Sequence, residues 1–248
     1  MSGYDVFARY YDSLTRNVAY GERADYLCRL LEHLGHPAGL TLDLACGTGS
    51  LTLELARRGL DIYGIDSSYA MLSQARQKAV QAGQDILYLC QQMQRIDLYG
   101  TVDTVFCSLD SINHLPGLRA VEQTFARVSL FMNPGGLFVF DVNSPYKHRS
   151  VLADNTFVYD LEDVYCVWQN STDRRTCRTR VDIDFFEKDG QTYWRSSEHF
   201  TETGYDPDTL EELLHAQGFG KVCRFADMTF DPPEETTQRI IFTAEKQL

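Results

Sequence analysis

Apolar residues in the first 145 positions form short runs, separated by segments with helical spacing. The runs predict β-strands at 40–45, 61–65, 86–90, 102–107 and 136–142. The helical segments are the first stretch, from Tyr4 to Leu34, and then 49–58, 69–82 and 118–130. Strands that alternate with helices of this length are typical of a parallel sheet with helices on both faces. We therefore predict an α/β fold with a doubly wound, mostly parallel sheet.

The pattern changes after Pro145, where aromatic, strand-like segments follow one another without a helix. They span 156–168, 177–187 and 192–200, and Asp189-Gly190 between the last two is a strong hairpin signal. The α/β pattern then resumes, with a helix at 207–217 and strands at 221–225 and 237–245. We predict that 146–200 is an antiparallel β insertion in a Rossmann-like domain formed by 1–145 and 201–248. The insertion is expected to be a lid and substrate surface; the alternative is a dimerisation sheet, which would make the protein a homodimer.

The stretch from Leu42 to Gly49 is the most informative part of the chain. An apolar strand ends there in Asp43 and in a turn that contains Gly47 and Gly49, and the next strand ends in Asp66. Glycine permits positive φ and lets a ligand approach the backbone closely. A strand–turn–helix–strand unit of this kind predicts the nucleoside-binding half of a doubly wound sheet.

Two residues of this unit indicate which nucleoside it binds. A dinucleotide site normally has a third small residue where this chain has Thr52, and its pyrophosphate would lie close to Asp43 and be repelled. S-adenosylmethionine (SAM) carries a sulfonium and an ammonium and no phosphate, so it suits Asp43 better. Asp66 would accept hydrogen bonds from the ribose hydroxyls. SAM is therefore the expected cofactor, and an NAD-type oxidoreductase is the alternative.

The same residues resemble a known family. Leu42 to Gly49, with Tyr63-Gly64-Ile65-Asp66-Ser67-Ser68 and Met71-Leu72, resembles the class I SAM-dependent methyltransferases, in the small-molecule branch with an insertion late in the fold. The resemblance extends from Tyr4 to Lys246 and implies methyl transfer to a small molecule by in-line displacement. The accepting atom, nitrogen, oxygen or carbon, stays open. A non-catalytic SAM-binding protein is an alternative from a different class.

Ligands of open α/β sheets bind at the carboxyl ends of the strands, which places the candidate cofactor residues in the loops that follow. Together with a residue of the N-terminal segment, these are Tyr11, Asp43, Ala45, Cys46, Gly47, Gly49, Asp66, Ser67, Met71, Gln92, Met93, Ser108 and Leu109. Carbonyls near Ala45 and Gly47 would accept from the SAM ammonium, and Met71 would pack on the adenine. The resemblance implies that Tyr11 hydrogen-bonds the SAM carboxylate and that Gln92 stands where relatives carry an acid that contacts adenine.

The resemblance also implies which residues face the methyl acceptor. They are Asp110, Asn113, Asp141 and Asn143. A protonated amine or a hydroxyl must lose a proton before or during transfer, and imidazole titrates near neutral pH. The candidate general bases are therefore His114, His148 and His199. We expect no metal to be required.

Composition restricts the partners and the location. With 35 acidic and 23 basic side chains the net charge is −12, which disfavours nucleic acid as a substrate. We expect no membrane span, because no apolar run approaches 18 residues, and no secretory signal at the N-terminus. The seven cysteines include no C-x-x-C pair and are expected to be reduced thiols in a cytoplasmic protein that binds a small-molecule substrate.

Overall fold

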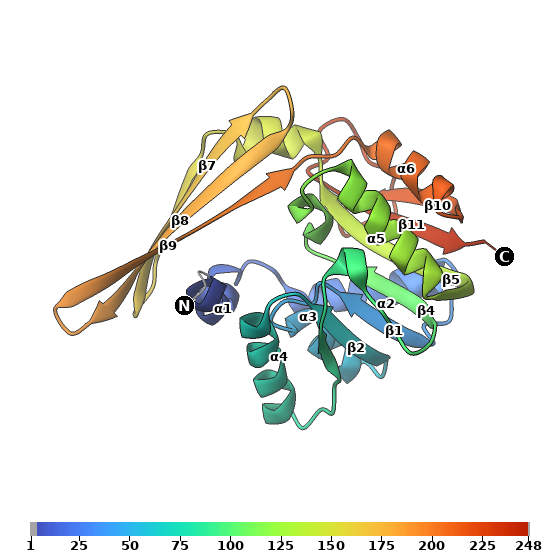
Figure 1. The fold of residues 1–248 in the computed structure, drawn as a ribbon, viewed down its shortest axis with the longest axis horizontal. Helices are drawn as coiled ribbons and strands as arrows, with labels where there is room; N and C mark the ends of the chain where they lie inside the picture. Colours follow the sequence, from blue (N-terminus) through green and yellow to red (C-terminus); the bar gives the residue numbers. More distant parts are fainter. Residues whose placement is uncertain (1–3, 248) are drawn as a thin grey trace.

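The main feature of the protein is a seven-stranded sheet with strand order β10-β11-β5-β4-β1-β2-β3, seen in a computed structural model that describes residues 4–247 (Figure 1). Its strands are β1 (Leu40–Leu44), β2 (Asp61–Asp66), β3 (Tyr88–Cys90), β4 (Val102–Cys107), β5 (Met132–Asn143), β10 (Phe219–Ala226) and β11 (Arg239–Lys246). Only β11 runs antiparallel to its neighbours, β5 and β10. The predicted α/β fold with a mostly parallel sheet is confirmed.

Helices cover both faces of this sheet, which explains its nearly continuous apolar strands. On one face lie α2 (Tyr20–His33) and α3 (Ser50–Arg57), which pack on Phe106, Val139 and Ile241. On the other face lie α5 (Leu118–Leu130) and α6 (Pro207–Ala216), which pack on Phe138 and other apolar side chains. Phe138 and Val139 serve opposite faces because successive side chains of a strand point in opposite directions. At the β3 edge, α4 (Tyr69–Gln81) packs on Tyr88.

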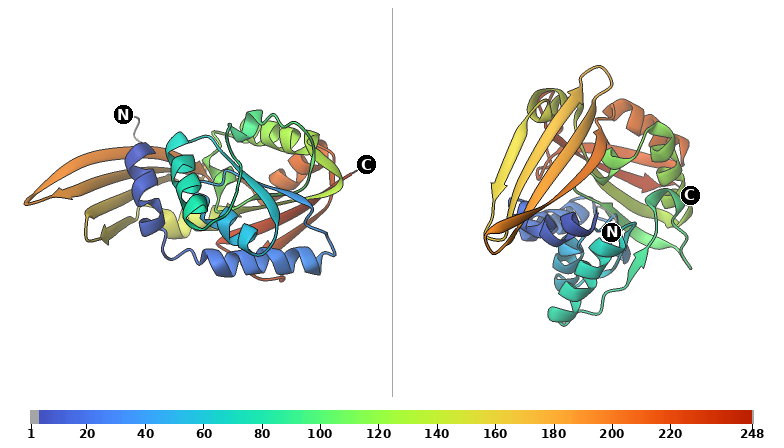
Figure 2. Two further views of the ribbon diagram at one scale, coloured as in Figure 1. Left: turned by 90° about the horizontal axis from the view of Figure 1, so that it is seen from below. Right: turned by 60° about the vertical axis from the view of Figure 1, so that its left-hand side comes forward.

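A separate four-stranded antiparallel sheet projects from this body (Figures 1 and 2). It consists of β6 (Thr156–Asp160), β7 (Val164–Asp173), β8 (Arg178–Asp189) and β9 (Thr192–Thr203). The predicted hairpin is present, since Asp189 pairs with Thr192 and Gly190 has φ 61°. The segment 156–168, expected as one strand, is two, because the chain reverses after Asp160 and Leu161 donates to the Val164 carbonyl.

The predicted helix from Tyr4 to Leu34 is also two helices. The first, α1 (Tyr4–Leu14), leaves the body and packs between the antiparallel sheet and α4. Its Phe7, Ala8 and Leu14 are buried with Met71 of α4 and with apolar residues of β7 and β8. The Phe7 amide also donates to Glu198 Oε1 on β9 at 3.0 Å. Because the helix is interrupted near residues 15–19, the apolar side of α1 packs on the antiparallel sheet and not on the main sheet.

One further strand boundary differs from the expectation. We predicted that this strand begins at residue 136, but β5 begins at Met132 and includes Pro134 and Gly135. An irregular register accommodates them, because Val102 pairs with Met132 while Thr104 pairs with Leu137. Within the part of the chain that the structure describes, none of the helices combines the length and apolar character needed to span a bilayer.

Candidate active site

Two neighbouring cavities open at the carboxyl ends of the parallel strands. The first, of about 180 Å³, lies over the glycine turn and is lined by residues including Gly47, Asp66 and Met71. It continues into a space of about 240 Å³ beside Gln92 and Met93 and a smaller one at Asp43. The second cavity, of about 260 Å³, lies between the edge of the body and the antiparallel sheet. The two cavities share the side chains of Phe7, Tyr11, Leu109, His114 and Phe200.

Asp66, at the end of β2, organises the glycine turn. Its two oxygens accept from the amides of Gly47 at 2.9 Å and Ser68 at 2.8 Å. The turn needs glycine at position 49, because φ is 70° there and an added Cβ would lie 2.7 Å from the Tyr88 hydroxyl oxygen. Burial raises the pKa of Asp66, although the backbone donors oppose this change. The Asp66 carboxylate is therefore held rigidly at the first cavity.

Asp43, at the end of β1, is almost fully buried beside the same cavity. Its carboxylate accepts from the Thr52 hydroxyl at 2.6 Å, and burial raises its pKa to about 7. Thr52 therefore has a role that the sequence did not indicate, because it binds the acid of the motif where a dinucleotide site would have a small residue. Among residues 4–247, neither Asp43 nor Asp66 has a cationic side chain within 4.0 Å.

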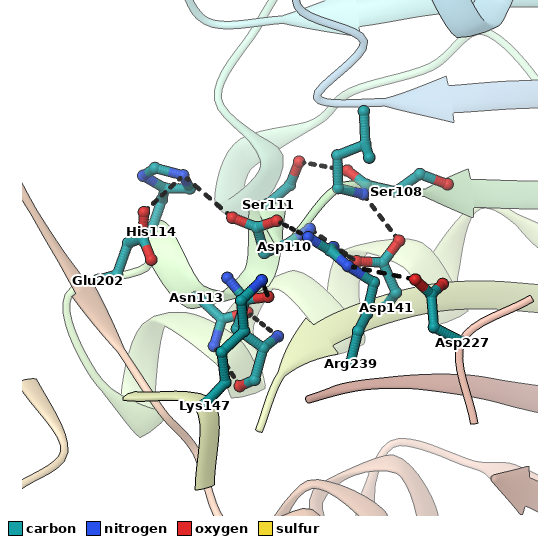
Figure 3. Close-up of polar contacts among 12 residues, drawn as sticks. Ser108, Asp110, Ser111, Asn113, His114, Asp141, Lys147, Glu202, Asp227 and Arg239 are labelled. Carbon is teal, nitrogen blue, oxygen red and sulfur yellow. Dashed lines mark hydrogen bonds and ion pairs between the residues drawn. The ribbon is translucent and has the colours of Figure 1, made fainter. Parts of the chain in front are cut away.

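The floor of the second cavity is built on Arg239, the first residue of β11. Its guanidinium donates to Asp110 and to Asp141, and its Nε lies 4.0 Å from Asp227 Oδ2 (Figure 3). On the far side, Arg23 lies 3.8 Å from Asp141 and 3.1 Å from Asp227. Five charged side chains from separate parts of the chain therefore form one largely buried network, in which Asp227 is the most exposed member.

Within this network Asp141 supports a strained loop. Its carboxylate accepts from the amides of Leu109 and Asp110, each at 2.7 Å. These two non-glycine residues have φ of 60° and 54°, a conformation that costs free energy and needs support from its surroundings. Asp141 is only 2% exposed and lines neither cavity. It thus positions the loop that separates the cavities.

Three polar side chains converge where the two cavities meet. His114 Nε2 lies 4.0 Å from Asp110 Oδ2 and 3.9 Å from Glu202 Oε1 (Figure 3). Burial raises the pKa of Glu202, and the neighbouring Asp110 adds to this rise. Burial alone would also raise the pKa of Asp110, but Arg239, with His114 and Lys147, holds it below its usual range. The two carboxyl groups of this cluster are therefore driven toward different protonation states.

Most of the predicted site residues line these cavities. They are Tyr11, Asp43, Ala45, Cys46, Gly47, Asp66, Ser67, Met71, Gln92, Met93, Ser108, Leu109, Asp110, His114 and Asn143. Gly49 shapes the turn without lining a cavity. Asn113 is fully buried and its amide binds the carbonyls of Asn143 and Thr203, so it ties the body to β9.

Two of the predicted histidines do not reach the cavities. His148 is fully buried, with Nδ1 2.8 Å from the Thr179 hydroxyl. His199 is exposed on β9, where it pairs with Asp182. Three charged residues that line the second cavity were not predicted from the sequence: Lys147, Glu202 and Arg239. The sequence feature that could have identified Arg239 is its position as a charged residue at the start of the apolar strand 239–246.

The sheet order, the glycine turn between two buried acids and the cavities at the carboxyl edge define a Rossmann-like methyltransferase. The methyltransferase domain family matches residues 41–136. The Bacillus subtilis (strain 168) protein named "Putative methyltransferase YqeM" is 34% identical over 98% of this chain and 97% of its own length. The chain belongs to the SAM-dependent methyltransferases, so the expected cofactor and enzyme class are confirmed and the NAD-type alternative is wrong.

Solved structures agree with this assignment. A SAM-dependent methyltransferase from Clostridium acetobutylicum ATCC 824 superposes with a TM-score of 0.87 at 30% identity, over 99% of both chains. The sugar N-methyltransferase KedS8 from Streptoalloteichus sp ATCC 53650 reaches a TM-score of 0.78 at 21% identity, over 99% of this chain and 93% of its own. The latter similarity shows the fold alone.

Proposed function

We propose that this enzyme methylates the nitrogen of a small-molecule amine bound in the second cavity. The observation that carries the proposal is the cluster of Asp110, His114 and Glu202 at the junction of the cavities. Two carboxyl groups and an imidazole there lie within 4.8 Å of one another, so a single protonated nitrogen can donate to all three.

The first cavity suits SAM in our proposal. Asp43 is buried and Asp66 is partly buried, and neither has a cationic partner within 4.0 Å among residues 4–247, which fits an ammonium at Asp43 and ribose hydroxyls at Asp66. Gln92 and Met93 lie where the cavity continues and would contact the adenine. Tyr11 and Leu109 line both cavities, so they would lie beside the methionine part of the cofactor.

Bound SAM supplies a methyl group on a sulfonium, and attack by a neutral amine forms the C–N bond as the C–S bond breaks. The protein must therefore attract an ammonium ion and then remove its proton. Asp110 stays ionised beside Arg239 and attracts the cation, while His114 and Glu202 are the proton acceptors. His114 is partly exposed, so it can pass the proton to solvent. Phe7 and Phe200 line the other side of the junction and would shield the reacting atoms from water there.

The antiparallel insertion 146–200 is the acceptor-binding part of the enzyme in this proposal, and 1–145 with 201–248 form the SAM-binding domain. Phe157, Tyr159, Trp168 and Val181 of the insertion line the second cavity, which supports a substrate role over dimerisation alone. A homodimer through the outer face of this sheet is the second candidate role. All seven cysteines are free thiols, which supports a cytoplasmic location, and the net charge of −12 supports a small-molecule acceptor over nucleic acid.

Methyl transfer from tritium-labelled SAM to matched acceptors tests the proposal. We expect transfer to benzylamine and 2-phenylethylamine and none to benzyl alcohol or 2-phenylethanol. Pretreatment with EDTA should leave the rate unchanged, because the cluster binds an amine; loss of activity on chelation would indicate instead that Asp110, His114 and Glu202 hold a divalent cation. Preferential methylation of the alcohols would contradict the proposal.

We expect Glu202→Gln to reduce kcat/KM for an amine by about 100-fold, since removal of a group that accepts a proton in catalysis typically costs this much or more. The Kd for SAM should change less than twofold, because Glu202 lines only the second cavity. His199→Gln on the exposed side of the same strand is the control and should keep wild-type kcat/KM. Equal activities of Glu202→Gln and wild type would remove Glu202 from the mechanism.

SAM binding should weaken as the pH falls below about 7. Burial raises the pKa of Asp43 to about 7, and an ammonium binds its ionised form, so a protonated Asp43 must release a proton when SAM binds. We expect Kd to be constant just above pH 7 and to rise by up to tenfold per pH unit below it. Calorimetry in buffers of different ionisation enthalpy measures the proton release. In Asp43→Asn this pH dependence should disappear.

A further inference from the structure

We propose that the methyl acceptor is a zwitterion, whose anionic group, a carboxylate or a phosphate, is bound by Lys147 while its amine lies at the Asp110–His114–Glu202 cluster. The position of the amine in this inference rests on the proposed function. The position of the anionic group depends on Lys147 alone. The acceptor class is thus an amino acid or an amino phosphate with an apolar or aromatic side chain.

Lys147 is a half-buried cation that lacks an acidic partner. It begins the short helical segment η3 (Lys147–Leu152), lines the second cavity and donates to Asn143 Oδ1 at 2.8 Å. Among residues 4–247 no carboxylate oxygen lies within 4.0 Å of its Nζ; burial and the neighbouring Arg239 lower its pKa, and the more distant carboxylates of Asp110, Glu202 and Asp141 oppose this change only in part. Removing an ammonium from water without a counter-ion is costly. An anion in the cavity would supply the missing partner.

Arg239 does not compete for this anion. Its guanidinium already binds Asp110 and Asp141 and lies near Asp227, so its donors are occupied by protein carboxylates. Figure 3 shows the Lys147 side chain beside Asn113, apart from the three carboxylates that surround Arg239. Lys147 is therefore the cation on the wall of the second cavity that is available to a ligand.

The charges on the cavity wall match a neutral zwitterion better than a simple cation. Asp110 and Glu202 line this wall together with Lys147 and Arg239, and Arg239 is already neutralised by Asp110, Asp141 and Asp227, which leaves Lys147 as the cation with no close counter-ion. A simple amine would add a positive charge beside these two cations and beside the sulfonium of the cofactor. A carboxylate or phosphate on the same molecule cancels that charge and pairs with Lys147.

The cavity also has room for the rest of such a molecule. Its other wall is aromatic and aliphatic, formed by Phe157, Tyr159, Trp168 and Val181 among others, which suits an apolar side chain. Lys147 also lines an open surface groove of about 420 Å³ that extends along residues 236–238. An anion at Lys147 would therefore lie at a mouth of the cavity, where a bulky phosphate is accommodated as readily as a carboxylate.

Binding of anionic probes tests the anion site without any methyl transfer. In calorimetry with the enzyme saturated with S-adenosylhomocysteine, we expect phenylacetate or phenyl phosphate to bind at least tenfold more tightly than neutral phenylacetamide. The preference between the two anions identifies the carboxylate or phosphate source. Lys147→Met should abolish the preference for anions, Lys147→Arg should keep it, and Lys188→Met, at an exposed position on β8, should leave it unchanged. Equal binding of phenylacetate, phenyl phosphate and phenylacetamide to the wild type would overturn the inference.

A second measurement separates this inference from the proposed function. We expect phenylalanine to be methylated with a kcat/KM at least tenfold above that of 2-phenylethylamine, and Lys147→Met to remove this difference mainly through KM. If neither compound is methylated while anion binding still depends on Lys147, the amine proposal fails and the anion site stands. If both are methylated equally by wild type and Lys147→Met, the amine proposal stands and the zwitterion is excluded.

Discussion

Replacing Arg239 with methionine should lower the free energy of unfolding by about 3–5 kcal/mol, the range found when one partner of a buried ion pair is removed. The Arg239 side chain is only 13% exposed and binds Asp110 and Asp141, which would be left close together without their main counter-ion. Asp141 would also hold the strained loop at Leu109 less firmly, because its carboxylate would lose the guanidinium that positions it. Urea denaturation followed by fluorescence measures the loss.

The exposed pair of Lys221 and Glu245 offers a matched control. Its atoms lie 2.7 Å apart, but the lysine side chain is 76% exposed, so Lys221→Met should cost less than about 1 kcal/mol. Adding Asp110→Asn to Arg239→Met should recover part of the stability by removing one uncompensated charge. A loss below about 1 kcal/mol in Arg239→Met would show that the network is not a main source of stability.

Replacing Asp66 with alanine should weaken SAM binding by about 1–3 kcal/mol, that is about 5- to 150-fold, for hydrogen bonds lost to a buried ligand. The carboxylate is proposed to bind the ribose, and it also holds the amides of Gly47 and Ser68 in the turn. The substitution therefore removes a ligand contact and loosens the backbone around it. Isothermal titration calorimetry measures the change.

Asp61→Asn provides the comparison for Asp66, because Asp61 is an exposed acid at the other end of the same strand. It should leave Kd within twofold of wild type. Unchanged affinity in Asp66→Ala, with a normal unfolding transition, would place the ribose elsewhere. If Asp66→Ala instead unfolds, Asp66→Asn, which keeps an oxygen acceptor, should fold and show an intermediate loss.

The sequence predicted those parts of the site whose functional residues lie close together in the chain, within one structural unit. Asp43, the glycine turn and Asp66 lie within 24 consecutive residues of one strand–turn–helix–strand unit, and parallel pairing brings the ends of β1 and β2 together. Any chain with this unit places the same groups at the carboxyl edge of its sheet, so the cofactor and the position of its cavity could be predicted from the local sequence pattern. The alternation of strands and helices predicted the main sheet for the same reason.

The acceptor side could not be predicted in this way, because its residues meet only through strand order. Arg239 reaches Asp110 and Asp141 because β11 inserts between β5 and β10 and pairs antiparallel with β5, Arg239 opposite Asn143. Lys147 lies at the start of the antiparallel insertion, and Glu202 lies near the end of β9, just after the predicted insertion boundary at residue 200. No spacing within the sequence indicates these contacts.

The histidines illustrate a second reason why the site could not be fully predicted: the sequence does not show which face of a strand points toward the site. Glu198 and Glu202 point inward from β9, and residues one position away must point outward, which exposes His199. Choosing the inward face requires knowledge of what covers the sheet, here α1. The break between α1 and α2 depends on the same contact, which joins residues far apart in the chain.

The two cavities share a border but differ in most of their walls. Tyr159, Trp168 and Val181 line the second cavity only, whereas Asp66, Ser67 and Met71 line the first cavity only. In the proposed assignment, mutations in β6, β7 and β8 would change which compounds are methylated during evolution, while the residues around the methyl donor are inherited unchanged. A mutant library confined to Tyr159, Trp168 and Val181 would be the corresponding route to enzymes with new acceptors.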